Sequence, residues 1–292
     1  MQLDIRKFGL QRRPFALGFL NAILTENRLT GREYRANGLD IERLGDRDQR
    51  GEWCGRDSRL PCGLDAREDI PQSADGSGLA WIALRGHHMA QGLARARLAR
   101  AAIWLNRRYN SPLPALVFLT DDDRTPDPLK AVRALPQGSL VILRARRTSR
   151  RIALVDAVAP VAKERRLFWL VADDPELASR AGADGAHFPE ARMAAVHHWR
   201  AVRAHWLITC AAHSLGACLH IGQIGADAAV LAPTFSTRSH GDGRALGPIR
   251  VRAIARQSAV PVYALGGIDD QTARRLRDAD LAGLAAVGAL AS

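Results

Sequence analysis

Residues 232–247, APTFSTRSHGDGRALG, bring together side chains that bind anions. Thr237, Arg238, Ser239 and His240 supply two hydroxyls, a guanidinium and an imidazole in a row, and three glycines follow within seven residues. Hydroxyl and guanidinium groups donate hydrogen bonds to phosphate oxygens, and glycine lets a backbone approach an anion closely. The segment fits either an anion-binding loop or a polar turn on the surface, depending on where the fold places it.

A glycine pair gives a second signal for phosphate. Gly266 and Gly267 end the apolar run VPVYAL, and Asp269 is placed to begin a helix behind them. Glycine amides in front of a helix bind phosphate because no Cβ blocks the approach and the helix dipole favours an anion. Gly288 follows a later apolar run in the same way. We predict that these three glycines, together with Arg238, bind phosphate.

Charged residues at the ends of two other apolar runs suggest further chemistry. Arg144 and Arg146 are candidates for a second anion clamp, since guanidinium groups match phosphate oxygens, although arginine is common throughout this chain and a surface role fits equally. Asp173 and Asp174 are candidate Mg²⁺ ligands. Either aspartate also fits the N-cap of a helix that begins near Pro175.

The composition is that of a globular protein, with 47% hydrophobic and 25% charged residues among 292. The net charge of +12 comes from scattered basic residues, nearly all arginine, so we expect no nucleic-acid partner. The sequence contains no run of 18 apolar residues, so we predict no membrane span. Four cysteines without a CxxC pair indicate buried thiols in a reducing cytoplasm, where we expect the protein to be located.

From residue 113 onward, short apolar runs alternate with stretches of helical spacing, which is typical of parallel strands covered by helices. Eight runs predict a (β/α)₈ TIM barrel, with a doubly wound sheet as the alternative. The predicted strands are residues 115–120, 140–144, 167–171, 185–188, 206–210, 228–232, 260–266 and 281–287.

In a barrel, these candidates would gather at one end, because the active site lies where the strands end. Thr120 ends the first predicted strand, His187 and Glu190 lie at the end of the fourth, and residues 232–247 follow the sixth. We predict that Thr120, His187 and Glu190 line the substrate pocket.

The N-terminal part of the chain has a different composition. Residues 1–88 are rich in Arg, Asp and Gly with sparse apolar residues, which predicts a largely disordered or irregular extension. Residues 89–111 carry Leu93, Leu98 and Leu105 at near-helical spacing, which predicts an amphipathic helix leading into the barrel. The barrel domain is then expected over residues 112–292.

Three segments of the predicted barrel resemble one known family. GADGAHF (182–188), HSLGACLHIGQIGADAAVLAPTFSTRSHGDGRALG (213–247) and VPVYALGGI (260–268) are similar to thiamine phosphate synthase and its relative the thiazole tautomerase. The resemblance spans about residues 115–290. It implies a (β/α)₈ barrel and a transferase that joins hydroxymethylpyrimidine pyrophosphate to thiazole phosphate, releasing pyrophosphate with the help of Mg²⁺.

The resemblance also implies roles for individual residues. It assigns pyrophosphate binding to Arg144 and Arg146, and one Mg²⁺ contact to Asp173. The loop after the sixth strand would contribute to catalysis through Thr237, Ser239 and His240.

The chain departs from the family pattern at several positions. Arg192 stands where the family has a second Mg²⁺ aspartate, and Glu190 or Asp174 is a candidate substitute. His240 replaces a lysine, and Pro233 stands where the tautomerase has its catalytic histidine, which argues against that activity. The other departures are Ile142 for a glutamine, Ala172 for an asparagine and Ala211 for a serine.

Two functional hypotheses follow. The first is a divergent thiamine phosphate synthase-like transferase of thiamine biosynthesis. The alternative is a catalytically impaired barrel that binds a phosphorylated ligand of the same pathway as a carrier or sensor. Both predict small phosphorylated ligands, and both are compatible with a homo-oligomer.

Overall fold

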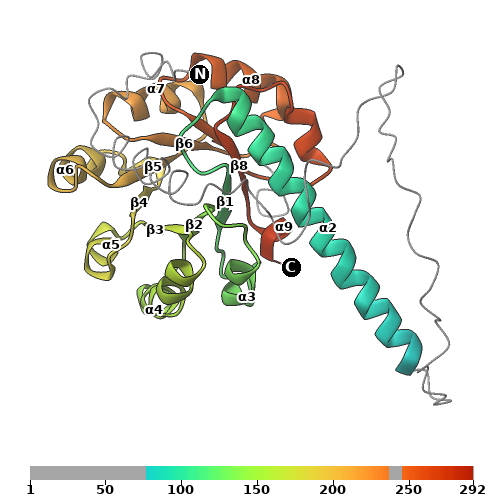
Figure 1. Cartoon of the computed structure of the whole chain (residues 1–292). Helices are drawn as coiled ribbons and strands as arrows, with labels where there is room; N and C mark the ends of the chain where they lie inside the picture. Colours follow the sequence, from blue (N-terminus) through green and yellow to red (C-terminus); the bar gives the residue numbers. More distant parts are fainter. Residues whose placement is uncertain (1–76, 237–244, 292) are drawn as a thin grey trace, which may run out of the picture. The chain divides into compact units, whose positions relative to one another are not determined.

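The computed structural model describes residues 77–236 and 245–291, and its centre is a closed barrel of eight parallel strands (Figure 1). Each strand pairs with the next along the chain, and β1 pairs with β8 to close the ring. The predicted barrel is confirmed, and the doubly wound sheet is excluded. The strands are β1 Leu116–Leu119, β2 Leu140–Leu143, β3 Phe168–Ala172, β4 Gly185–Phe188, β5 Leu207–Ala212, β6 Ala228–Leu231, β7 Val262–Ala264 and β8 Gly283–Ala286.

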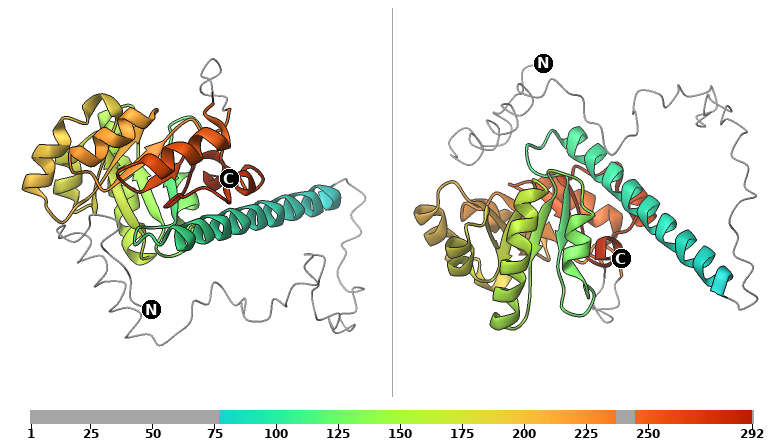
Figure 2. Two further views of the ribbon diagram at one scale, coloured as in Figure 1. Left: turned by 90° about the horizontal axis from the view of Figure 1, so that it is seen from above. Right: turned by 60° about the horizontal axis from the view of Figure 1, so that its bottom comes forward.

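Helices follow the strands and surround the barrel, as the two views of Figure 2 show. Among the described residues, no helix is long and apolar enough to cross a membrane. The helices are α2 Ser77–Tyr109, α3 Pro128–Arg133, α4 Thr148–Glu164, α5 Pro175–Ala181, α6 Ala195–Val202, α7 Leu215–Gln223, α8 Gly247–Gln257 and α9 Gly288–Ala291, with short 3₁₀ helices η4 Glu190–Arg192 and η6 Thr272–Leu276.

The strands are buried on both faces, because side chains fill the barrel interior and helices cover its outside. In β1, Val117 belongs to the interior cluster and Phe118 to the cluster under the helices, as the alternation of side chains along a strand requires. Tyr263 of β7 is fully buried in the interior cluster, and its hydroxyl donates to the carbonyl of Pro114 at 2.7 Å. The interior is therefore a packed core.

The thiols of the barrel behave as predicted. Cys210 and Cys218 are free and buried, and burial raises the pKa of Cys210 to about 12 and that of Cys218 to about 11. Neither thiol is therefore a ready nucleophile at neutral pH.

The helix before the barrel differs from its predicted bounds. It begins at Ser77, twelve residues before the predicted start, and ends at Tyr109. Leu98 and Leu105 are buried, whereas Leu93 is about half exposed. Residues 77–88 are thus helical rather than irregular, because Ser77–His88 contains no proline and includes several good helix formers. The prediction of disorder for residues 1–76 lies outside the described residues.

A second difference lies between β7 and β8. The sequence DQTARRLRDA predicts an α-helix, but its central residues form the short 3₁₀ helix η6. The two buried residues of η6, Ala273 and Leu276, are three positions apart. This spacing matches the three residues per turn of a 3₁₀ helix, which places both side chains on the same face.

Candidate functional site

The C-terminal ends of the strands form the mouth of the barrel, and the loop after β6 is fixed there at both of its ends. The amide of Phe235 donates to the carbonyl of Gly266 at 2.9 Å, and the amide of Gly247 donates to the carbonyl of Thr234 at 2.9 Å. The structure therefore places both stems of this loop beside β7. The side chains predicted to bind the anion lie outside the described residues, namely Thr237, Arg238, Ser239 and His240.

The glycine pair after β7 adopts a backbone that other residues avoid. Gly266 and Gly267 have φ angles of 98° and 64°. A Cβ at Gly267 would lie 2.8 Å from the Cβ of Phe235 and 2.9 Å from the carbonyl oxygen of Ser236. Within the described part of the chain, neither glycine amide donates to a protein acceptor. Both N–H groups thus have no acceptor among the described residues.

Gly288, the third predicted phosphate residue, is the first residue of α9 and follows β8 directly. No heavy atom lies within 4 Å of the position that a Cβ would take there. The space beside Gly288 is therefore open, in contrast to the crowded surroundings of Gly267. Its phosphate role stays a prediction, as do those of Gly266 and Gly267.

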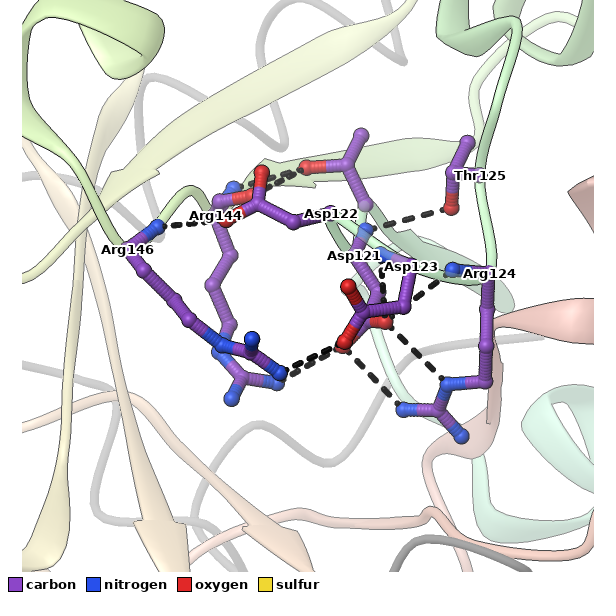
Figure 3. Close-up of polar contacts among 8 residues, drawn as sticks. Asp121, Asp122, Asp123, Arg124, Thr125, Arg144 and Arg146 are labelled. Carbon is purple, nitrogen blue, oxygen red and sulfur yellow. Dashed lines mark hydrogen bonds and ion pairs between the residues drawn. The ribbon is translucent and has the colours of Figure 1, made fainter.

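Three consecutive aspartates after β1 contact the arginines that follow β2 (Figure 3). Asp121 Oδ2 lies 3.5 Å from Arg144 Nη1, and Asp123 Oδ2 lies 2.6 Å from Arg146 Nη2. Asp122 accepts a hydrogen bond from the amide of Arg146 at 2.8 Å. The two loops are therefore joined by both backbone and charge contacts, and both predicted arginines carry a carboxylate partner.

Asp121 is the most buried carboxylate of this group, and Arg124 contacts both of its oxygens at 3.3 Å. Burial, the largest single influence, would raise the pKa of Asp121, whereas the hydrogen bond and charge of Arg124 lower it. Hydrogen bonds from the amides of Asp123 and Arg124 lower the pKa of Asp121 further, to a net value below its usual range. Asp121 is therefore ionised at neutral pH and holds Arg124 and Arg144 electrostatically.

The two predicted Mg²⁺ ligands after β3 also have cationic partners. Asp173 Oδ1 accepts from Arg192 Nη1 at 2.8 Å, and both side chains are about half exposed. Asp174 caps α5 by accepting from the amide of Leu177 at 2.9 Å, and it pairs with the mostly buried Arg151 at 3.3 Å. Asp174 thus performs the N-cap role that the sequence left open.

Asp173 has a left-handed backbone, with φ of 58°, which is uncommon for residues other than glycine but tolerated by aspartate. Its amide donates to the carbonyl of His187 at 2.9 Å, which continues the pairing of β3 with β4. The Asp173 carboxylate is therefore held at the mouth by a defined backbone geometry.

His187 lies at the end of β4 but is buried rather than open to solvent. Its Nδ1 is 2.9 Å from the hydroxyl oxygen of Thr209 on β5. Burial, with a smaller contribution from the positive charge of Arg144, lowers the pKa of His187 to about 4. The imidazole is therefore neutral at physiological pH and offers either a donor or an acceptor, according to its tautomer.

The other two predicted pocket residues serve the loops themselves. The Thr120 hydroxyl accepts from the Arg144 amide at 2.8 Å and donates to the Arg144 carbonyl at 3.0 Å. Glu190 Oε2 contacts His213 Nδ1 at 2.6 Å and accepts from the His213 amide at 3.0 Å. Thr120 thus fixes the position of Arg144, and Glu190 joins the ends of β4 and β5. Whether either touches substrate stays a prediction.

The carboxylates described at the mouth do not fit the ligand set that Mg²⁺ prefers. Mg²⁺ takes octahedral oxygen ligands, usually one or two carboxylates together with substrate phosphates. Asp173 is held by Arg192, Asp174 is committed to its helix cap and to Arg151, and no group of three metal-ligating side chains occurs among the described residues. We therefore assign no chemical step to a metal ion.

Sequence reasoning missed one residue that organises this region. Arg151 donates to the carbonyl of Ala145 at 2.9 Å, between the two candidate arginines, and also pairs with Asp174. The signal was present in the spacing of α4, where Arg151 stands four residues before Val155 and seven before Val158, both fully buried. A charged residue on the buried stripe of a helix needs polar partners in the core.

The model of the family described as thiamine monophosphate synthase matches residues 116–290. A solved structure, a thiamine phosphate pyrophosphorylase from Pyrococcus furiosus, aligns with a TM-score of 0.52 and 22% identity over 61% of this chain and 87% of that chain. At that identity the structural match supports the barrel fold alone.

The names of similar curated proteins point to the same family. The thiamine-phosphate synthase of Methanoculleus marisnigri is 30% identical over 61% of this chain and 86% of its own length, and that of Chlorobium luteolum is 28% identical over 62% and 87%. A protein of Aquifex aeolicus whose name places it among thiamine-phosphate synthases is 30% identical over 39% of this chain, but the match spans only 61% of its own length.

Proposed function

The chain belongs to the thiamine monophosphate synthase family, and from that premise we propose that it is a transferase of thiamine biosynthesis. The reaction joins hydroxymethylpyrimidine pyrophosphate to thiazole phosphate and releases pyrophosphate. The observation that carries the proposal is the match of residues 116–290, the whole barrel, to this family. The relatives matched over most of their length are named as synthases, which favours catalysis over the alternative of a binding protein.

The geometry supports two anion positions at the mouth. On one side, Arg144 and Arg146 follow β2 and present half-exposed to exposed guanidinium groups. On the other side, the amides of Gly266 and Gly267 follow β7. The proposed assignment gives the pyrophosphate to the arginines and the thiazole phosphate to the glycines, with Gly288 and Arg238 assisting.

The proposed chemistry is a displacement at the methylene carbon of the pyrimidine. The carbon–oxygen bond to pyrophosphate breaks, and its electron pair leaves with the pyrophosphate oxygen. The thiazole nitrogen then donates its lone pair to the carbocation and forms the new carbon–nitrogen bond. Because no proton has to be removed in these steps, the protein's task is to orient the two substrates and stabilise the leaving charge.

The loop after β6 completes this proposal. Its stems lie against the glycine pair, so Thr237, Ser239 and His240 are within a loop that begins and ends at the mouth. We assign to them hydrogen bonds to the pyrophosphate, with Thr120, His187 and Glu190 shaping the pocket. The proposal also includes a cytoplasmic location, no nucleic-acid partner and assembly into a homo-oligomer.

Incubation of the purified full chain with both substrates tests the activity. Thiamine phosphate and pyrophosphate are expected in equal amounts, measured by chromatography and by a coupled pyrophosphate assay. The reaction is run with Mg²⁺, the cofactor that the family resemblance implies, and again with a chelator. Absence of thiamine phosphate in both conditions, with the protein shown to be folded by circular dichroism, would refute the activity.

A further inference from the structure

Six carboxylates in the loops after β1, β3 and β4 contact an arginine or histidine side chain. The arrangement differs from that of a metal site, in which carboxylates face one another across an ion. The contacts are Asp121 with Arg124 and Arg144, Asp122 with Arg150, Asp123 with Arg146, Asp173 with Arg192, Asp174 with Arg151, and Glu190 with His213.

A divalent ion at Asp173 would have to share this carboxylate with a guanidinium. The contact of Arg192 Nη1 with Asp173 Oδ1 is 2.8 Å, a normal length for a charge-assisted hydrogen bond, and the same nitrogen lies 3.4 Å from the Asp173 carbonyl. The second carboxylate of that loop, Asp174, is engaged by the Leu177 amide and by Arg151. Arginine side chains of the protein itself thus supply positive charge at the ends of β3 and β4.

The arginines retain donors for a further anion. The side chains of Arg144, Arg146 and Arg192 are 52%, 68% and 52% exposed. A guanidinium has five N–H donors, and the contacts with Asp121, Asp123 and Asp173 occupy only part of them. Guanidinium groups also match phosphate oxygens with paired, planar hydrogen bonds.

The three arginines come from adjacent parts of the mouth. β2, β3 and β4 are consecutive neighbours in the barrel, and Arg192 contacts Asp173, the residue directly after β3. Arg144 and Arg146 follow β2, and η4, which carries Arg192, follows β4, so the three arginines come from the same end of the barrel. Beside Arg146, a solvent-open hollow of about 530 Å³ is lined by Asp122, Asp123, Arg146, Arg147, Ser149 and Arg150.

We propose that Arg144, Arg146 and Arg192 bind the diphosphate group of the substrate directly and replace the divalent metal ion in that role. Only the identity of the anion, a diphosphate, rests on the proposed function. Diphosphate replaces Asp123 on one side of the Arg146 guanidinium and Asp173 on one side of the Arg192 guanidinium. The guanidinium N–H groups then stabilise the negative charge on the oxygens of the leaving diphosphate. Since arginine stays protonated throughout the physiological range, this charge does not depend on metal supply.

Calorimetric titration of the full chain with inorganic pyrophosphate tests the proposal without turnover. In a buffer with chelator, the wild type is expected to bind pyrophosphate, and added Mg²⁺ should change the affinity by less than about threefold. Arg192→Ala and Arg146→Ala should each weaken binding by about tenfold or more, because each loses a charge-assisted contact. Both side chains are at least half exposed, so neither variant should unfold.

Arg133→Ala is the matched control. Arg133 is an exposed arginine of α3 with a weak 4.0 Å contact to Glu164, and its loss should leave pyrophosphate binding unchanged. Binding of Mn²⁺ to the wild type without pyrophosphate, seen by electron paramagnetic resonance, would overturn the proposal. Pyrophosphate binding that requires Mg²⁺, or that is equal in Arg192→Ala and Arg133→Ala, would also overturn it.

The outcomes separate the two proposals. If the protein binds pyrophosphate in the presence of a chelator but makes no thiamine phosphate, the arginine site is supported and the synthase activity is refuted. If the protein makes thiamine phosphate only with Mg²⁺, the synthase activity is supported and the replacement of the metal ion by arginines is refuted.

Discussion

His187 shows how a barrel interior takes a titratable group out of its usual range. The ring lies against Thr209 among buried strands, and burial is the main reason that its pKa falls to about 4. An imidazole with that pKa cannot serve as a proton donor in its charged form at neutral pH. Its contribution to a pocket is the hydrogen-bonding pattern of a neutral ring, set by the contact with Thr209.

The low pKa makes stability depend on pH in a defined window. Between pH 4 and 6.5, the unfolded chain binds a proton at this position that the folded protein does not, so stability falls as the pH decreases. We expect the part due to His187 to amount to about 2 kcal/mol between pH 7 and pH 5. Urea unfolding at both values should show a smaller decrease in His187→Gln than in wild type, and equal decreases would contradict the assignment.

Arg151 shows how one side chain connects three elements. It stands in the first turn of α4, donates to the Ala145 carbonyl after β2, and pairs with the aspartate that caps α5. Removing the guanidinium leaves a carbonyl without its donor and weakens the charge balance at Asp174. The segment between Arg144 and Arg146 would also lose the contact that holds its backbone.

Arg151→Met is therefore expected to lower the free energy of unfolding by about 2–3 kcal/mol. The same substitution at Arg133, whose contact with Glu164 is exposed, should change it by less than about 0.5 kcal/mol. Urea titration of both variants measures the difference. Similar values for the two positions would show that the Arg151 contacts do not stabilise the loop.

The strands could largely be predicted from the sequence, because each is a short apolar run bounded by polar residues. Six of the eight runs contain the whole observed strand, and β3 and β5 extend one and two residues beyond their predicted ends. The largest difference is at β7, which is four residues shorter than predicted because apolar residues such as Val260 lie outside the strand. The start of α2 was missed because the apolar residues of Ser77–His88 are consecutive, LAWIAL, and show no helical spacing. The site was only partly readable, since spacing predicts which residues reach the mouth but not that Asp173 and Arg192 pair there.

The closed ring depends on contacts between residues far apart in sequence. β1 pairs with β8, Tyr263 donates to Pro114, and Asn106 of α2 donates to the carbonyls of Leu113 and Ala282 at 2.8 and 2.7 Å. Asn106 thus ties the helix before the barrel to the segments that enter its first and last strands. We expect the barrel to unfold as one unit, because each strand pairs with two neighbours and opening the ring at any point leaves two strand edges unpaired.

Asn106→Ala tests this closure. Two carbonyls lose their donor, so the free energy of unfolding should decrease by about 2 kcal/mol, with an unchanged dependence on urea and a single transition. Gln257→Ala is the control, because that side chain is exposed and donates only within α8, and its effect should stay within about 0.5 kcal/mol. A second transition in Asn106→Ala would contradict cooperative closure.

The packed interior described above has a consequence for the kinetics. With Tyr263 and its neighbours filling the barrel, ligands reach the site only through the mouth, so two substrates and two products share one passage. A molecule seated deeper must arrive before, and depart after, the one that covers it. Binding should therefore be sequential in a fixed order, and a product resembling the outer substrate should compete with it alone.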